Sequence, residues 1–145
     1  MIKQKFDEEN ARDCLYNMLS TIYKFERYLV LTFGLNYQEI YLMSLLKMES
    51  PKKMSEVSSG LKIEAFSASR LVARMIEKSL VKRYKAGKDR RNVFISLTPH
   101  GEAMITQIQT RSVEILKDNA QTAEESVIDS FLTGARHIHN LLRTD

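Results

Sequence analysis

The order of sequence patterns between residues 64 and 101 constrains the fold of this chain more than any other feature. A segment with helical periodicity comes first, and its apolar positions share one side of a helical wheel: Ala68, Leu71, Val72, Met75 and Ile76. Two short runs rich in β-branched and aromatic residues follow, LVKRYK and NVFISL. The loop between them, residues 86–91, contains Gly87, which can adopt a positive φ. This order predicts an amphipathic helix followed by a two-stranded β-hairpin.

A shorter helical segment, MSEVSSGLKI, precedes this helix and supplies a glycine-containing turn. The side of the longer helix that faces away from its apolar positions carries mostly hydroxyl and basic side chains: Phe66, Ser67, Arg70, Arg74 and Lys78. Two short helices joined by such a turn, the second with basic groups outward, are typical of a helix-turn-helix. The hairpin that follows is then typical of a wing.

Long amphipathic segments flank this region on both sides. In the first, apolar residues recur every three or four positions from Ala11 to Leu29, and the pattern ends near Gly34. Asn36 and Glu39 predict the capped start of a second helix. The predicted fold class is therefore mainly α with a small β-hairpin wing.

Two further helices are predicted after the hairpin. Thr98 as a cap and Pro99 at the first helical position begin one of them. Thr122 and Glu125 predict a capping box before the other. These long helices exceed what a small winged domain needs to cover its own core, so their apolar faces are expected to pair with a second copy of the chain.

The composition is that of a globular protein, with 145 residues, 43% hydrophobic and 28% charged, which favours a single domain. The sequence has no apolar run of membrane-spanning length, and its start, MIKQKFDEEN, is too polar and acidic for a signal peptide. One cysteine excludes an intramolecular disulfide and fits a reducing compartment. We therefore expect a cytoplasmic protein that does not enter a membrane.

The excess positive charge is confined to the middle third of the chain. Residues 47–91 hold 13 basic and 5 acidic side chains, a net charge of +8, whereas the segments before and after have net charges of −1 and −3. Such an asymmetry indicates a polyanion-binding face on an otherwise neutral or acidic body.

From about Leu35 to Gly101 the chain resembles the MarR family, the multiple antibiotic resistance regulators, which are dimeric winged-helix transcription factors. The resemblance rests on Gln38, on SASRLVARMIEKSLVKR as recognition helix and first wing strand, and on DRR and ISLTPHG after them. It implies one MarR-type domain over residues 1–145. About 1–34 and 99–145 would be dimerisation helices, and about 35–98 the winged helix-turn-helix DNA-binding region.

The N-terminal half of a recognition helix enters the major groove, so three of its side chains are expected to meet base edges or phosphates: Ser67, Ser69 and Arg70. Arg74 lies one turn further on and is placed for a backbone phosphate. The resemblance implies that Asp89 braces the wing by pairing with an arginine and that Arg91 enters the minor groove. The other basic side chains of the wing would contact phosphates: Lys85, Lys88 and Arg90.

Two positions depart from the family pattern. Ser79 stands where a glycine is usual, which makes the end of the recognition helix less favourable. Phe66 occupies a position usually held by a small polar residue. Its ring could contact a thymine methyl group, or it could fold back and hold the start of the helix against its neighbour.

Cys14 lies in the first helical segment, where some relatives that sense peroxide carry a reactive cysteine near tyrosines. Tyr16 is close, but Asp13 disfavours the thiolate, and a free cysteine beside an apolar stripe is commonly a small buried hydrophobe. We therefore expect a buried structural cysteine, with redox sensing as the alternative. The three histidines lack metal-site spacing, so no metal and no cofactor are expected.

The predicted function is a homodimeric, sequence-specific transcription regulator, a repressor in preference to an activator. An enzyme is not expected, because the sequence has neither a glycine-rich phosphate loop nor a nucleophile elbow. Its partners would be a pseudo-palindromic operator in double-stranded DNA, a second copy of the chain and a small-molecule effector that releases the DNA. Two alternatives stay open: a redox-responsive regulator acting through Cys14, and a dimeric protein-interaction module that retains the winged-helix fold.

Overall fold

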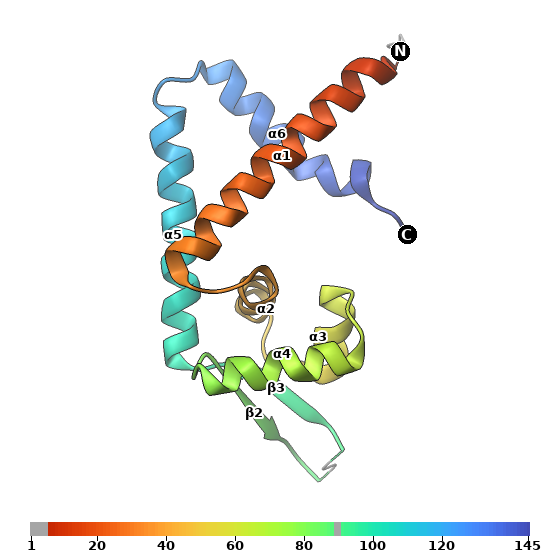
Figure 1. Cartoon of the computed structure of the whole chain (residues 1–145), viewed down its shortest axis with the longest axis vertical. Coiled ribbons are helices and arrows are strands. Elements are labelled where there is room, and N and C mark those ends of the chain that lie inside the picture. The colour runs from red at the N-terminus through yellow and green to blue at the C-terminus, as the bar shows by residue number, and fades with distance from the viewer. Residues whose placement is uncertain (1–5, 89–90) are drawn as a thin grey trace. The chain divides into compact units, whose positions relative to one another are not determined.

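The computed structural model describes residues 6–88 and 91–145, and Figure 1 shows the elements that they form. In order, these are α1 (Glu8–Phe33), α2 (Tyr37–Met48), β1 (Lys52–Lys53), α3 (Met54–Leu61), α4 (Ala65–Glu77), β2 (Val81–Lys85), β3 (Val93–Leu97), α5 (Pro99–Ala120) and α6 (Glu125–Leu142). The predicted order of helices and hairpin is confirmed. The fold is mainly α, with a winged helix-turn-helix over α2 to β3.

Two caps fix the boundary between α1 and α2. α1 ends at Gly34, which has a left-handed φ of 69° and donates its N–H to the Val30 carbonyl at 3.0 Å. α2 begins after Asn36, whose side chain accepts the Glu39 N–H at 2.9 Å. The Glu39 carboxylate in turn accepts the Asn36 N–H at 3.1 Å. The capping box predicted at these two residues is confirmed.

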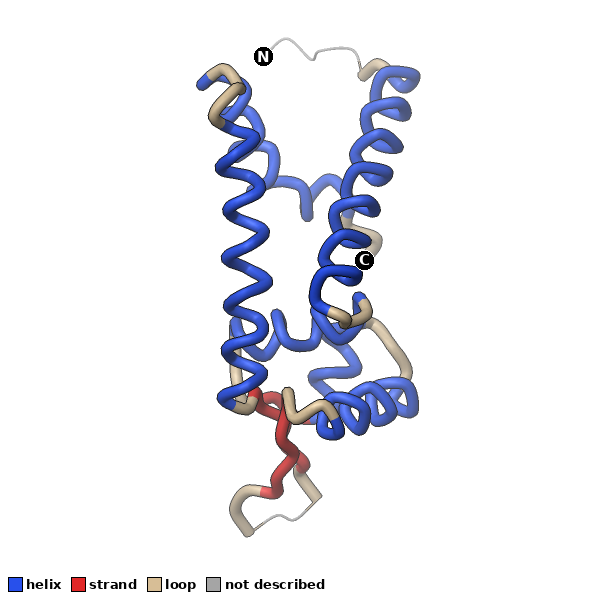
Figure 2. The backbone as a smooth tube through the Cα atoms, turned by 60° about the vertical axis from the view of Figure 1, so that its left-hand side comes forward, coloured by secondary structure: helices blue, strands red, loops and turns tan. Residues whose placement is uncertain are grey.

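The wing is part of a three-stranded antiparallel sheet in the order β1-β3-β2. Strands β2 and β3 pair from Val81 with Leu97 to Lys85 with Val93, and Figure 2 shows them in red, projecting beyond α4. The sequence predicted only the two strands of the hairpin. That was incomplete, because Lys52 and Lys53 pair with Ile95 and Phe94. A strand of two residues is too short to show the alternation by which strands are recognised.

The core of the winged region gathers side chains from every element that surrounds α4. Its largest members expose less than 2% of their surface: Leu42, Met43, Leu46, Val57, Leu71, Val72, Met75, Leu80, Ile95 and Ile105. Burying one such side chain contributes about 1.5–3 kcal/mol. This core holds the inner face of α4, so its opposite face is presented to solvent.

The end of α4 is joined closely to the start of α5. Leu80 donates its N–H to the Met75 carbonyl at 3.0 Å and Ser79 donates to Ile76 at 2.9 Å, the two bonds of a Schellman motif. Ser79 has a φ of 58°, so a serine adopts the conformation for which glycine is usual. Its carbonyl accepts the Thr98 hydroxyl at 2.6 Å. The Thr98 hydroxyl oxygen accepts the Gly101 N–H at 3.0 Å, which confirms Thr98 as the predicted cap of α5.

The chain divides into two compact units, Met1–Thr106 and Gln107–Asp145. The second unit consists of the end of α5 and all of α6, where the predicted capping box is wrong. Glu124 is the cap residue of α6 and makes no capping bond through its side chain, while the Thr122 hydroxyl donates to the Asn119 carbonyl at 3.2 Å. The expected assignment of the chain to one domain with two dimerisation segments stays a prediction. Among the described residues, no helix is both long enough and apolar enough to cross a membrane.

Candidate nucleic-acid interface

Helix α4 separates its residues into a buried face and an exposed face. Four of the five positions predicted to be buried expose 1% or less: Ala68, Leu71, Val72 and Met75. The fifth, Ile76, is 39% exposed, so the helical wheel was wrong for that residue. The predicted contact residues all lie on the exposed part of the helix: Ser67, Ser69, Arg70 and Arg74. Their base and phosphate contacts stay predictions.

Phe66 is the second residue of α4 and exposes 70% of its surface. The guanidinium carbon of Arg70 lies over the ring, 5.6 Å from its centroid, which is the geometry of a cation–π contact. The ring therefore does not hold the start of α4 against a neighbouring helix, which was one of the two expectations for it. It stands on the outside of the recognition helix, beside the arginine expected to read a base.

A buried carboxylate holds the other end of α4. Glu39 of α2 is 2% exposed, and its two oxygens lie 2.9 and 2.8 Å from the Lys78 ammonium. Nε of Arg74 lies 3.8 Å from one of the same oxygens, and the Arg74 side chain keeps 44% of its surface exposed. Arg74 can therefore face a phosphate with one part of its guanidinium while Glu39 orients another.

Sequence reasoning assigned Glu39 only a capping role and missed this cluster. The one signal in the sequence was that this carboxylate directly precedes a largely apolar helical run, IYLMSLL. A carboxylate buried in such a place requires a cation. Which cation supplies the charge depends on the fold.

The wing presents basic side chains along β2 and its loop. Strand β2 buries Val81 and exposes the residues that follow, and Tyr84 stacks on Phe94 of β3 with ring centroids 5.9 Å apart. Gly87 has the predicted positive φ, at 73°. Lys85, Lys88 and Arg91 are exposed. The predicted brace, Asp89, and the predicted phosphate contact, Arg90, lie outside the described residues.

Two exposed basic residues of β2 were missed by the sequence reasoning, Lys82 and Arg83. Successive residues of a strand point to opposite faces of the sheet, so these two side chains flank the hairpin. They add positive charge between α4 and the tip of the wing. The sequence of β2 could have indicated them, because Val81 is its only aliphatic residue and the strand therefore has little to bury after its first position.

The comparisons with known proteins agree with this geometry. A family model described as a winged helix DNA-binding domain matches residues 35–101. The HTH-type transcriptional regulator MgrA of Staphylococcus aureus is 27% identical over 93 residues, which cover 64% of this chain and 63% of that protein's length. A MarR family protein from Bacillus stearothermophilus has a similar structure, with a TM-score of 0.82 and 18% identity over 94% of this chain and 98% of that one. This chain has a winged helix-turn-helix fold similar to that of the MarR family protein.

A second similar solved structure is that of FabT of Streptococcus pneumoniae, determined in complex with DNA. Its TM-score is 0.78 at 16% identity, over 94% of this chain and 97% of FabT. MgrA is by its name an HTH-type transcriptional regulator.

Cys14 is exposed, so the expectation of a buried structural cysteine is wrong. Its thiol donates to the Asn10 side-chain oxygen, with sulfur and oxygen 3.6 Å apart. The residue lies at the edge of the apolar stripe of α1. Among the residues that the structure describes, no group of three or more His, Cys, Asp or Glu side chains is placed to hold a metal ion.

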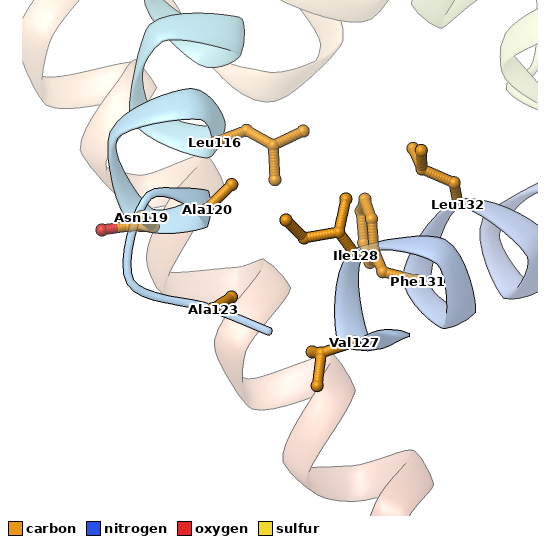
Figure 3. Close-up of a pocket in the computed structure, with 8 residues that line it drawn as sticks. All are labelled: Leu116, Asn119, Ala120, Ala123, Val127, Ile128, Phe131 and Leu132. Atoms are coloured by element: carbon orange, nitrogen blue, oxygen red, sulfur yellow. The ribbon is translucent and has the colours of Figure 1, made fainter. Parts of the chain in front are cut away.

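The second unit contains an apolar pocket, which Figure 3 shows. Its volume is about 250 Å³, and its lining comes from the end of α5, the turn and the first half of α6: Leu116, Asn119, Ala120, Ala123, Val127, Ile128, Phe131 and Leu132. A pocket lined in this way can accept an apolar group of a ligand or of another polypeptide chain.

Proposed function

We propose that this protein is a homodimeric, sequence-specific transcription regulator that binds duplex DNA through α4 and the β2–β3 hairpin. The observation that carries the proposal is the exposed face of α4, with Ser67, Ser69 and Arg70 near its N-terminal end, followed by an exposed basic hairpin. The match of residues 35–101 to a winged helix DNA-binding domain supports it, as does the net charge of +8 in residues 47–91. In such proteins the recognition helix enters the major groove.

The dimer is supported by apolar side chains that the single chain leaves exposed. α6 contains no buried residue, and five of its large apolar side chains expose more than 40% of their surface: Val127, Phe131, Leu132, Leu141 and Leu142. α1 exposes a comparable set: Tyr16, Leu19, Ile22, Tyr23 and Leu31. Amphipathic helices of this kind are stabilised mainly by packing of their apolar face, which a second copy can provide. A two-fold dimer would recognise a pseudo-palindromic operator.

We further propose that the protein acts as a repressor that a small molecule releases from DNA. The apolar pocket of about 250 Å³ beside α6 supports an effector with an apolar group. Such a ligand would act through its differential affinity for the dimers that can and cannot bind DNA. A regulator of this kind acts in the compartment that holds the chromosome, which in a bacterial cell is the cytoplasm.

The proposal is tested with duplex fragments from the region upstream of the protein's own gene, by fluorescence anisotropy over a range of salt concentrations. We expect specific, salt-dependent binding that Arg91→Ala weakens, with the slope of log affinity against log salt reduced by about 1 per lost contact. Lys117→Ala, an exposed basic residue of α5 outside the winged region, is the matched control and should bind as the unaltered protein does. If the unaltered chain showed no salt-dependent binding to any duplex, the protein-interaction module would be favoured.

The exposure of Cys14 favours a second candidate function, regulation by oxidation of its thiol. Peroxide treatment followed by mass spectrometry and DNA-binding measurements tests it. Oxidation at Cys14 together with loss of DNA binding would support it, whereas a Cys14→Ser variant that lost binding in the same way as the unaltered chain would refute it.

A further inference from the structure

We propose that Phe66 and Arg70 form one reading unit that recognises a thymine and a guanine in neighbouring base pairs of the operator. The Phe66 ring would contact the C5 methyl group of the thymine, and Arg70 would donate two hydrogen bonds to the guanine. This inference rests on the proposed function and specifies the bases that its DNA site contains.

The first observation is the exposure of Phe66. A phenylalanine that is 70% exposed leaves a large apolar surface in water. The exposed aromatic residues of α1 and α6 lie on faces that a second copy can cover. Phe66 lies instead in the first turn of α4, the part of a recognition helix that meets base edges. When DNA is bound, the floor of the major groove would cover the Phe66 ring.

The second observation is the contact between the two side chains. Arg70 follows Phe66 by four residues and therefore lies on the same side of the helix. Its guanidinium carbon is 5.6 Å from the ring centroid. A guanidinium carries its five N–H donors in one plane and in a fixed fork geometry. The ring thus limits the conformations of Arg70 before DNA is bound, which lowers the entropy lost on binding.

The chemistry of the groove then selects the bases. In the major groove, guanine presents two acceptors, O6 and N7, which match the paired donors of an arginine. Thymine presents a methyl group there, which is the apolar feature an aromatic ring can contact. A phosphate offers nothing to an apolar ring, so Phe66 would gain no stabilisation if this part of α4 faced the DNA backbone. Because the ring and the guanidinium touch, the two bases must be neighbours.

The inference is tested with sites selected from a library of random duplexes by the unaltered protein. The best site is then remade with deoxyuridine in place of each thymine and 7-deazaguanine in place of each guanine, one base at a time. These changes remove one methyl group or one N7 acceptor and leave base pairing intact. We expect one thymine whose replacement weakens binding about fourfold, the effect of one buried methyl group. Replacement of a guanine next to this thymine should weaken binding by about tenfold or more.

Three variants connect these bases to the residues. Phe66→Ala should bind the thymine and deoxyuridine duplexes equally, and Arg70→Ala should lose the preference for the guanine. Phe66→Leu keeps an apolar side chain without the ring, so it should retain the methyl preference and lose part of the guanine preference. Met48→Ala removes another exposed apolar side chain, 86% exposed at the end of α2, and should discriminate as the unaltered protein does.

The outcomes separate this inference from the function on which it rests. If the protein selects a site but no thymine methyl contributes to binding, or if Phe66→Ala keeps the methyl preference, the reading unit is refuted and the regulator stands. If Arg70 proves to read a guanine with no thymine beside it, the pairing of the two bases is refuted. If the unaltered protein selects no sequence at all, both proposals fail.

Discussion

Glu39 shows at the scale of one residue how the fold positions the recognition helix. Its carboxylate belongs to α2, but its two ionic partners come from the next part of the fold. Arg74 lies on α4, and Lys78 is the residue that caps the end of α4. Two cations and the Asn36 N–H satisfy a side chain that is 2% exposed. A buried charge with this many partners is strongly destabilising when it loses them and restricts the angle between the two elements that it joins.

We predict that Glu39→Gln lowers the free energy of unfolding by about 2 kcal/mol, less than the loss for a fully buried ion pair, because both cations are partly exposed and can be hydrated. Chemical denaturation at a fixed protein concentration measures the change. Glu114→Gln is the matched control, since Glu114 and its partner Arg111 are both exposed, and the change should cost less than about 0.5 kcal/mol. Equal losses of unfolding free energy in the two variants would show that burial of the Glu39 cluster does not contribute to stability.

A second residue-scale prediction concerns pH. Tyr41 of α2 donates its hydroxyl to the Glu26 carboxylate of α1, and this bond, together with burial and the negative charge of Glu26, raises the pKa of Tyr41 from 10.0 to about 12. Between these values the folded chain holds a proton that the unfolded chain has lost. Because the folded state then binds more protons, its stability falls as the pH rises from 10 to 12.

Tyr41→Phe should remove this part of the loss of stability, since phenylalanine has no proton to lose. Denaturation of the variant and of the unaltered chain at several pH values between 9 and about 12.5 measures it. Glu26→Gln should flatten the profile in the same way, because it removes the first cause of the pKa shift. A profile that neither variant changes would contradict the assignment.

At the scale of elements, the junction between α4, β2 and α5 leaves no room for a side chain at Gly101. A Cβ atom there would lie 1.9 Å from the Leu80 carbonyl oxygen. That carbonyl also accepts the Thr98 N–H at 3.1 Å, so it cannot move aside without losing a bond. The first turn of α5 is thus packed directly against the end of the recognition helix.

Gly101→Ala should therefore destabilise the chain by about 3 kcal/mol or more, as overpacking against backbone does. Gly134→Ala is the matched control, because a Cβ atom at that position of α6 meets nothing within 4 Å. It should stabilise the helix by up to about 1 kcal/mol. Thermal and chemical unfolding of both variants would reveal opposite signs, and a mild effect at Gly101 would contradict the packing.

The elements themselves could be predicted from the sequence because their signals are local. The spacing of apolar residues identified α1 and most of the buried face of α4, and the caps at Asn36 and Thr98 depend on neighbours within three residues. The bond between Glu39 and Lys78 joins residues 39 positions apart, and no local pattern indicates it. The contact between Phe66 and Arg70 was missed for another reason. Helical spacing allowed it, but their separation depends on the side-chain conformations that the fold selects.

At the scale of the whole molecule, the exposed apolar faces of the helices predict a defined assembly. We expect light scattering to give the mass of two chains of 16.8 kDa. Phe131→Asp places a charge on the exposed face of α6, where burial in an interface would cost several kcal/mol. This variant should give the mass of one chain and bind operator DNA more weakly.

Met48→Asp makes the same kind of change at the exposed end of α2 and should remain a dimer. If the unaltered chain had the mass of a monomer, or if Phe131→Asp remained a dimer, the assignment of this face to the interface would be wrong. Measurements at several protein concentrations separate a weakened dimer from a lost one.

The strand order β1-β3-β2 also has a consequence for solubility. β3 is paired on both sides, so the unpaired edges of the sheet belong to β1 and β2. Unpaired edges invite pairing with other chains, and charged side chains, lysine above all, oppose it. β1 consists of two lysines, and β2 carries Lys82, Arg83 and Lys85. Variants that neutralise the wing to weaken DNA binding would therefore also remove the charges that keep separate chains from joining edge to edge.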